Sequence, residues 1–140
     1  MLKKFFNNKK EEVKDTNNLS LLVAALLIHA AKIDNNYTEI EKEIIKKALI
    51  ELKLIQNNNY KDLLNKAEIK EQDSNQIIGF TKEIKKKPME FRLKIVEILL
   101  KIIYSDGVND DFESNLIRRI CGLLYVSDKD SGNLKLKIKK

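Results

Sequence analysis

Four carboxylate side chains lie close together in the stretch Ser105-Asp106-Gly107-Val108-Asn109-Asp110-Asp111-Phe112-Glu113. Apolar segments with helical periodicity flank this stretch, so the sequence predicts a turn between two helices. Asp-Gly is typical of the end of a helix, and Asp-Asp-x-Glu is typical of the first turn of the next one. The stretch is therefore an acidic, well-capped corner between helices.

A second copy of this pattern lies seventy-two positions earlier in the chain, and the shift places residues 22–54 on residues 94–126 without a gap. The acidic residues that coincide are Asp34 with Asp106 and Glu41 with Glu113. The apolar residues that coincide are Val23 with Ile95, Leu26 with Ile98, Leu27 with Leu99, Ile40 with Phe112, Ile44 with Leu116, Ile45 with Ile117 and Leu52 with Leu124. The sequence thus predicts an internal helix-turn-helix repeat with pseudo-two-fold symmetry.

If the two acidic turns meet at one end of a bundle, four carboxylates converge there. Two unit charges about 4 Å apart repel by about 4 kcal/mol at an effective dielectric constant of about 20, whereas a helix cap contributes about 1 kcal/mol. Capping alone would not hold such a cluster together, so protons, lysines or a cation must reduce the repulsion. Because every donor is an oxygen atom, the expected cations are calcium, magnesium or manganese rather than zinc.

The EF-hand loop is the nearest competitor for this pattern, and the spacing excludes it. That loop needs Gly at its sixth position and an acid at its twelfth. Counted from Asp106, these positions hold Asp111 and Ile117, and the count from Asp34 also ends on an isoleucine. The acidic turns are therefore shorter and built differently.

The other reactive side chains form no recognisable catalytic site. His29 is the one histidine and aligns with Lys101 in the repeat, which predicts a solvated position rather than a ligand role. Cys121 is the one cysteine and aligns with Leu49, so we expect a small buried hydrophobe in a reducing compartment. No glycine-rich loop has the form of a nucleotide-phosphate loop, and no serine or cysteine is flanked by a base. The sequence predicts a protein that is not an enzyme.

The elements that position the acidic turns are helices. Hydrophobic residues make up 43% of the chain and charged residues 34%, with one proline and no tryptophan, which favours an all-α fold. An almost wholly apolar helix over 19–33 must be central in the fold. Thr38 and Glu41 predict a capping box at the start of the next helix. Further helices are expected near 60–67, 77–84, 88–104 and 111–125.

The net charge of +6 is concentrated at the two ends of the chain. Residues 1–18 carry five lysines and three acids, and residues 128–140 carry five lysines and two acids. We therefore expect a flexible basic leader, a helical domain over 19–127 and a lysine-rich C-terminal tail, with no specific nucleic-acid partner. Phe5 and Phe6 beside lysines predict at most a weak peripheral contact with an anionic membrane surface.

The repeated pattern of an apolar helix, Asp-Gly, a short polar turn, Glu and another apolar helix resembles the tellurite-resistance TerB family. The similarity covers about residues 19–127. The second copy, Asp106 to Glu113, follows the family pattern, whereas the first carries Asn35 in place of Gly. Asparagine tolerates the left-handed backbone that glycine would supply at this position.

The resemblance implies a single compact bundle of about seven helices, in a cytoplasmic protein that is sometimes found at the inner membrane face. It also implies a metal site formed by both repeats, whose ligands by position are Asp34, Glu41, Asp106 and Glu113. The implied role is non-enzymatic, in the response to tellurite or general chemical stress. Because the same domain occurs in co-chaperones of the DjlA type, the alternative is a scaffold that binds a protein partner and uses its acids as helix caps.

Overall fold

The computed structural model describes residues 19–33, 37–55, 60–73, 77–106 and 111–139. Regular structure within them is entirely helical, and the predicted all-α fold is confirmed. No helix in this part of the chain is long and apolar enough to cross a membrane. A helix over 19–31 is followed by α2 (Glu39–Glu51), α3 (Tyr60–Asp73), α4 (Ile77–Ile84), α5 (Met89–Ile103), the 3-10 turn η1 (Tyr104–Asp106), α6 (Asp111–Leu123) and α7 (Asp128–Lys139).

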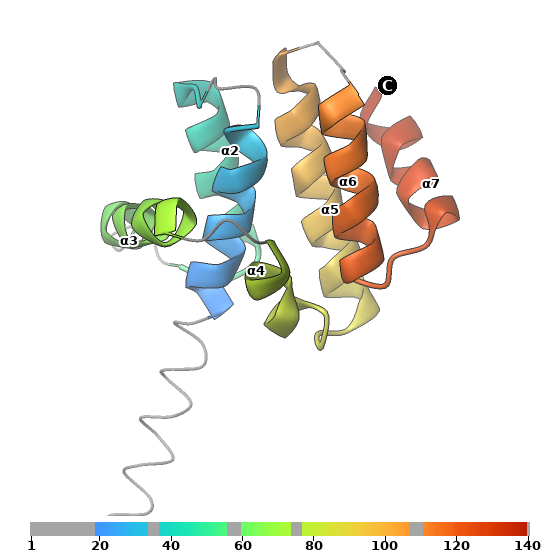
Figure 1. Cartoon of the computed structure of the whole chain (residues 1–140). Coiled ribbons are helices and arrows are strands. Elements are labelled where there is room, and N and C mark those ends of the chain that lie inside the picture. Colours follow the sequence, from blue (N-terminus) through green and yellow to red (C-terminus); the bar gives the residue numbers. More distant parts are fainter. Residues whose placement is uncertain (1–18, 34–36, 56–59, 74–76, 107–110, 140) are drawn as a thin grey trace, which may run out of the picture.

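The helices from both halves of the sequence share one bundle. Helix 19–31, α2, α5 and α6 run roughly along the same axis, whereas α3 lies across them (Figure 1). Of these, α5 has a central position, because it contacts α2, α6 and α7. The short helix α4 packs against α6 and so links the two halves a second time.

One continuous hydrophobic core holds the bundle together, and helix 19–31 contributes to it on nearly every side. All of residues 22–28 are buried, as are Ala30 and Ala31. The run 95–103 of α5 is buried too, except for Glu97 and Lys101. Burial of one large aliphatic side chain contributes about 1.5–3 kcal/mol, so these two helices supply much of the apolar stabilisation. The central position that the sequence predicts for the first helix is confirmed.

The helices α2 and α6 end in the same conformation at positions seventy-two residues apart. Lys53 and Tyr125 both have a left-handed backbone, with φ of 59° and 56°. The amide that follows each of them donates to the carbonyl five residues earlier, at 3.0 Å in α2 and 2.9 Å in α6. Both ends are therefore Schellman motifs, which satisfy the last carbonyls of the helix.

Near the same two helix ends, backbone carbonyls accept hydrogen bonds from two side chains that are also seventy-two positions apart. Ser20 Oγ donates to the carbonyl of Leu54 at 2.7 Å, and Arg92 Nη1 donates to the carbonyl of Leu124 at 2.9 Å. A hydroxyl group and a guanidinium group from corresponding positions thus each satisfy a carbonyl beyond a helix end, but the two acceptors are seventy positions apart and do not align. The internal repeat stays a prediction, which the matching Schellman motifs at Lys53 and Tyr125 support.

The C-terminal segment differs from the expected lysine-rich tail. Residues 128–139 form α7, which packs against α5. Ser127 Oγ caps the helix by accepting a hydrogen bond from an amide of its first turn at 3.1 Å. Ser131 is buried, and Leu134 and Ile138 pack against the core. Two apolar side chains one helical turn apart and a small residue are enough to dock a helix that otherwise carries many lysines.

The left-handed backbone at Lys53 predicts that Lys53→Gly stabilises the protein. A side chain in this conformation costs about 1–2 kcal/mol, and the greater unfolded-state entropy of glycine offsets about 0.5–1 kcal/mol of that gain. We expect urea denaturation to show a free energy of unfolding raised by about 0.5–1 kcal/mol. Lys47→Gly, at an exposed position inside α2, is the control and should lower it by about 1 kcal/mol. Equal losses in both variants would contradict the left-handed helix end.

Candidate functional site

The helix ends that flank the two predicted acidic turns lie at the same end of the bundle. Helix 19–31 ends and α2 begins where α5 ends and α6 begins, at the top of Figure 1. This follows because each pair of helices is antiparallel and α2 packs against α5. The fold therefore has the overall orientation that a shared acidic site requires.

Glu41 is the one predicted ligand whose side chain lies in the described part of the structure. It is 6% exposed and forms the capping box that the sequence predicts. Glu41 Oε1 accepts hydrogen bonds from Thr38 N at 3.1 Å and from Thr38 Oγ1 at 3.0 Å, while Glu41 N donates to Thr38 Oγ1 at 3.2 Å. A carboxylate has about four acceptor sites, so this capping role is compatible with a role as a metal ligand.

The other three predicted ligands cannot be compared with Glu41 in the same way. Asp34 lies outside the described residues, and so do the side chains of Asp106, at the end of η1, and Glu113, near the start of α6. Among the side chains that are described, no three His, Cys, Asp or Glu residues lie close enough together to hold a metal ion. The four-carboxylate site stays a prediction.

A polar network that the sequence did not predict joins helix 19–31 to α3. His29 Nδ1 lies 3.2 Å from Glu71 Oε1, and Lys32 Nζ lies 3.1 Å from Glu71 Oε2. Tyr37 Oη donates to Glu68 Oε1 at 3.2 Å. The solvated position expected for His29 is wrong, because 27% of its side chain is exposed and it faces a carboxylate. The signal in the sequence was a pair of polar residues, His29 and Lys32, three positions apart at the end of a largely apolar segment.

These polar contacts are important for α3 because this helix buries little apolar surface. Ala67 is its one buried residue, and Leu63 and Leu64 are partly buried. Tyr60 Oη adds a hydrogen bond to the carbonyl of Lys42 at 3.1 Å. A hydrogen bond to a charged group contributes about 1.5–3 kcal/mol. These polar contacts therefore contribute to holding α3 against the bundle.

Tyr37 is the residue of this network whose ionisation the fold changes most clearly. Burial, and then the neighbouring carboxylate of Glu68, raise the pKa of Tyr37 well above its ordinary value, because both disfavour the phenolate. The ring also lies 4.8 Å from the ammonium group of Lys42, in a cation–π contact. Tyr37 therefore remains a hydrogen-bond donor to a higher pH than an ordinary tyrosine does.

Cys121 is buried, as the sequence predicts. Burial raises the pKa of its thiol, and a hydrogen bond with Ser131 and the charge of Lys135 oppose this effect without reversing it. Since the thiolate is the nucleophilic form of cysteine, this environment does not activate the side chain.

Tyr37 is expected to make the stability of the protein depend on alkaline pH. Its phenol ionises near about pH 10 in the unfolded chain, whereas the folded protein retains the proton to higher pH. The folded state then binds more protons than the unfolded state, so stability falls as pH rises above about 10. In urea denaturation between about pH 9 and about pH 11, Tyr37→Phe should lose stability less steeply than the parent. Tyr125→Phe, which changes an exposed tyrosine, should match the parent. A slope in Tyr37→Phe as steep as the parent's would disprove the assignment.

The family model described as tellurite resistance protein TerB matches residues 20–136. No curated protein and no solved structure gives a significant match. The matched segment contains both predicted acidic turns and most of α7. It therefore extends beyond residue 127, where the sequence predicted the end of the domain.

Proposed function

The chain belongs to the TerB family, whose model covers most of its length, and on this premise we propose that it is a non-enzymatic domain that binds a divalent cation. The proposed ligands are Asp34, Glu41, Asp106 and Glu113, from the two acidic turns. The proposed role is in the response to tellurite or other chemical stress, in the cytoplasm or at the inner membrane face. The cation would join the two turns and neutralise their carboxylates.

The observation that carries this proposal is the position of Glu41. Its carboxylate is 6% exposed and lies at the end of the bundle that both pairs of helices share. A carboxylate has about four acceptor sites, so the capping box with Thr38 is compatible with a ligand role for Glu41. The all-oxygen character of the four proposed ligands suits calcium, magnesium or manganese.

A second candidate function is that of a protein-interaction domain, similar to that of a co-chaperone, in which the acids only cap helices. The capping box favours it, because Thr38 and Glu41 satisfy one another without a cation. Several large apolar side chains are exposed and available to a protein partner: Ile40, Ile69, Ile78, Tyr125 and Leu136. A weak membrane contact through Phe5 and Phe6 also stays a proposal, since these residues lie outside the described part of the chain.

Two substitutions at the capping box separate the cation site from a structural cap. Glu41→Gln keeps a capping-box side chain but removes the ligand charge, whereas Thr38→Ala removes the cap and keeps the carboxylate. For a cation site, calorimetric titration with calcium, magnesium or manganese should detect binding in the parent and in Thr38→Ala. Binding should weaken by at least about tenfold in Glu41→Gln, because affinity depends on the charge of the ligands. Asp34→Asn/Asp106→Asn should lose binding as well.

For a purely structural cap, the same variants should give the opposite pattern. No cation should bind to any of them at millimolar concentration. Thr38→Ala should lower the free energy of unfolding by about 1 kcal/mol, and Glu41→Gln should change it by less than about 0.5 kcal/mol. Absence of binding in the parent protein would refute the proposed cation site.

A further inference from the structure

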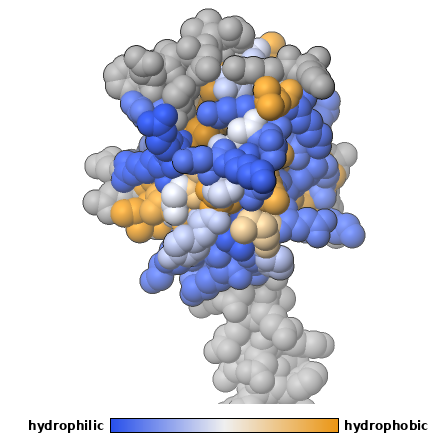
Figure 2. Space-filling view, turned by 90° about the vertical axis from the view of Figure 1, so that its right-hand side faces the viewer, coloured by the Kyte–Doolittle hydropathy of each residue, from blue (hydrophilic) through white to orange (hydrophobic). Residues whose placement is uncertain are grey.

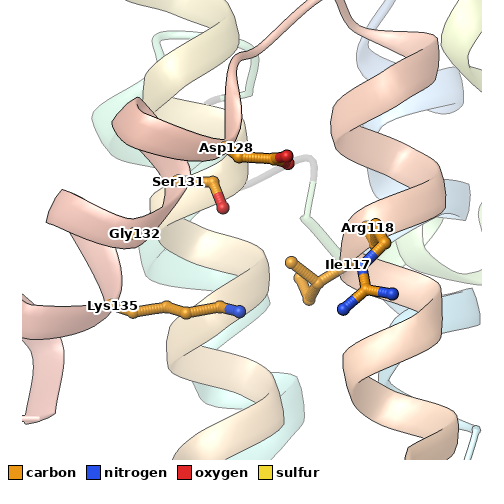
Figure 3. Close-up of a pocket in the computed structure, with 6 residues that line it drawn as sticks. All are labelled: Ile117, Arg118, Asp128, Ser131, Gly132 and Lys135. Carbon is orange, nitrogen blue, oxygen red and sulfur yellow. The ribbon is translucent and has the colours of Figure 1, made fainter.

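A groove of about 440 Å³ lies between α6 and α7. Figure 3 shows the side chains of Asp128, Ser131 and Lys135 extending from α7 toward α6, with Ile117 and Arg118 on the facing helix. The face of the molecule that carries α7 is mainly hydrophilic (Figure 2). The groove is therefore a polar recess rather than an apolar docking surface. Its lining residues are Ile117, Arg118, Asp128, Ser131, Gly132 and Lys135.

Two cationic side chains approach this groove from opposite walls. The guanidinium group of Arg118 comes from α6, and the ammonium group of Lys135 comes from α7 (Figure 3). Neither side chain forms an ion pair with a residue that the structure describes, whereas Lys137, also on α7, lies 3.6 Å from Glu97. The cations of the groove are thus available to an anion from outside the chain.

The groove also has one acidic group, and its position limits the ligands that fit. Asp128 lies at one end of the recess, while Arg118 and Lys135 lie toward the other (Figure 3). A guanidinium group binds phosphate through two parallel hydrogen bonds, and an ammonium group adds a point charge. The carboxylate of Asp128 would repel an anion nearby but can accept hydrogen bonds from hydroxyl groups. A fitting ligand therefore has an anionic end and a hydroxyl-bearing end.

Gly132 keeps the groove wide. A Cβ atom added at this position would meet nothing within 4 Å. Packing therefore does not demand a glycine here, although glycine is unfavourable inside a helix by about 0.8–1 kcal/mol relative to alanine. The volume of the groove is within the range of about 300–1,000 Å³ that is usual for small-molecule sites.

We propose that the groove between α6 and α7 binds the phosphate group of a small molecule that also carries hydroxyl groups, such as a sugar phosphate. Arg118 and Lys135 bind the phosphate, and Asp128 accepts hydrogen bonds from the hydroxyl groups. The groove is distinct from the proposed cation site, because none of its six lining residues is a proposed metal ligand.

Calorimetric titration of the full chain in phosphate-free buffer tests this proposal. Glucose 6-phosphate should bind more tightly than inorganic phosphate, and glucose should show no binding. Arg118→Gln and Lys135→Gln should each weaken binding by at least about tenfold, as expected for loss of a charged hydrogen bond. The matched controls Arg119→Gln and Lys129→Gln change exposed neighbours that do not line the groove, and they should bind like the parent.

Two further variants test the geometry of the groove and leave both cationic side chains, Arg118 and Lys135, in place. Gly132→Leu should abolish binding by filling the groove, while circular dichroism shows an unchanged or raised melting temperature because helix propensity increases. Asp128→Asn should strengthen the binding of inorganic phosphate and reduce the preference for the sugar phosphate. Unchanged affinity in Gly132→Leu would overturn the proposal.

A phosphate group with neighbouring hydroxyl groups also occurs in lipid headgroups, so vesicles of phosphatidylglycerol are tested beside the free sugar phosphate. Binding of the free compound, reduced in Arg118→Gln, supports a soluble ligand. Binding of vesicles alone, with the same dependence on Arg118, assigns the phosphate group to a lipid. Equal weakening in Arg118→Gln and Arg119→Gln would show non-specific attraction to a basic surface and would overturn the site.

Discussion

The burial of helix 19–31 on nearly every side is the constraint on which the rest of the structure depends. A helix that is apolar all round has no face that water can solvate, so other helices must surround it. Helix 19–31 and its antiparallel partner α2 share one core with the pair α5 and α6, and α5 contacts helices from both halves of the sequence. The two pairs lie side by side, so that α2 and α6 begin at the same end of the molecule. The proposed cation site follows from how this apolar helix is covered.

The correspondence between the two halves is closest where the backbone is most unusual. Lys53 and Tyr125 differ in size and polarity, yet both hold the left-handed conformation that ends a helix in a Schellman motif. Ser20 and Arg92 also lie seventy-two positions apart and each donates to a carbonyl beyond a helix end, but their acceptors, Leu54 and Leu124, do not align. Equivalent Schellman motifs at residues of different chemistry are expected if the two halves have a common architecture and their sequences have since diverged. The correspondence therefore supports the duplication independently of the apolar pattern.

Two polar regions of the surface differ in how completely their charges are paired. In the network around α3, Glu71 lies between His29 and Lys32 and Glu68 accepts from Tyr37, so each group has a partner within the chain. This network is well suited to hold a helix that buries little apolar surface. In the groove between α6 and α7, the two cations form no ion pair with a described residue. Paired charges stabilise the fold, whereas unpaired cations in a recess are suited to a ligand.

The sequence by itself determined the all-α fold, the central apolar helix and the capping box of Thr38 and Glu41. These features depend on periodicity and on hydrogen bonds between residues a few positions apart, which a linear pattern records directly. The tertiary structure decided the pairing of His29 with Glu71, forty-two positions away, the docking of residues 128–139 as α7, and the groove lined by Arg118 and Lys135. Each of these depends on which helix faces meet in space, and one apolar core can be covered by helices in more than one arrangement. The same reason separates the acidic residues from the site they are proposed to form: the pattern identified the residues, whereas a shared site also requires the two turns to meet in space.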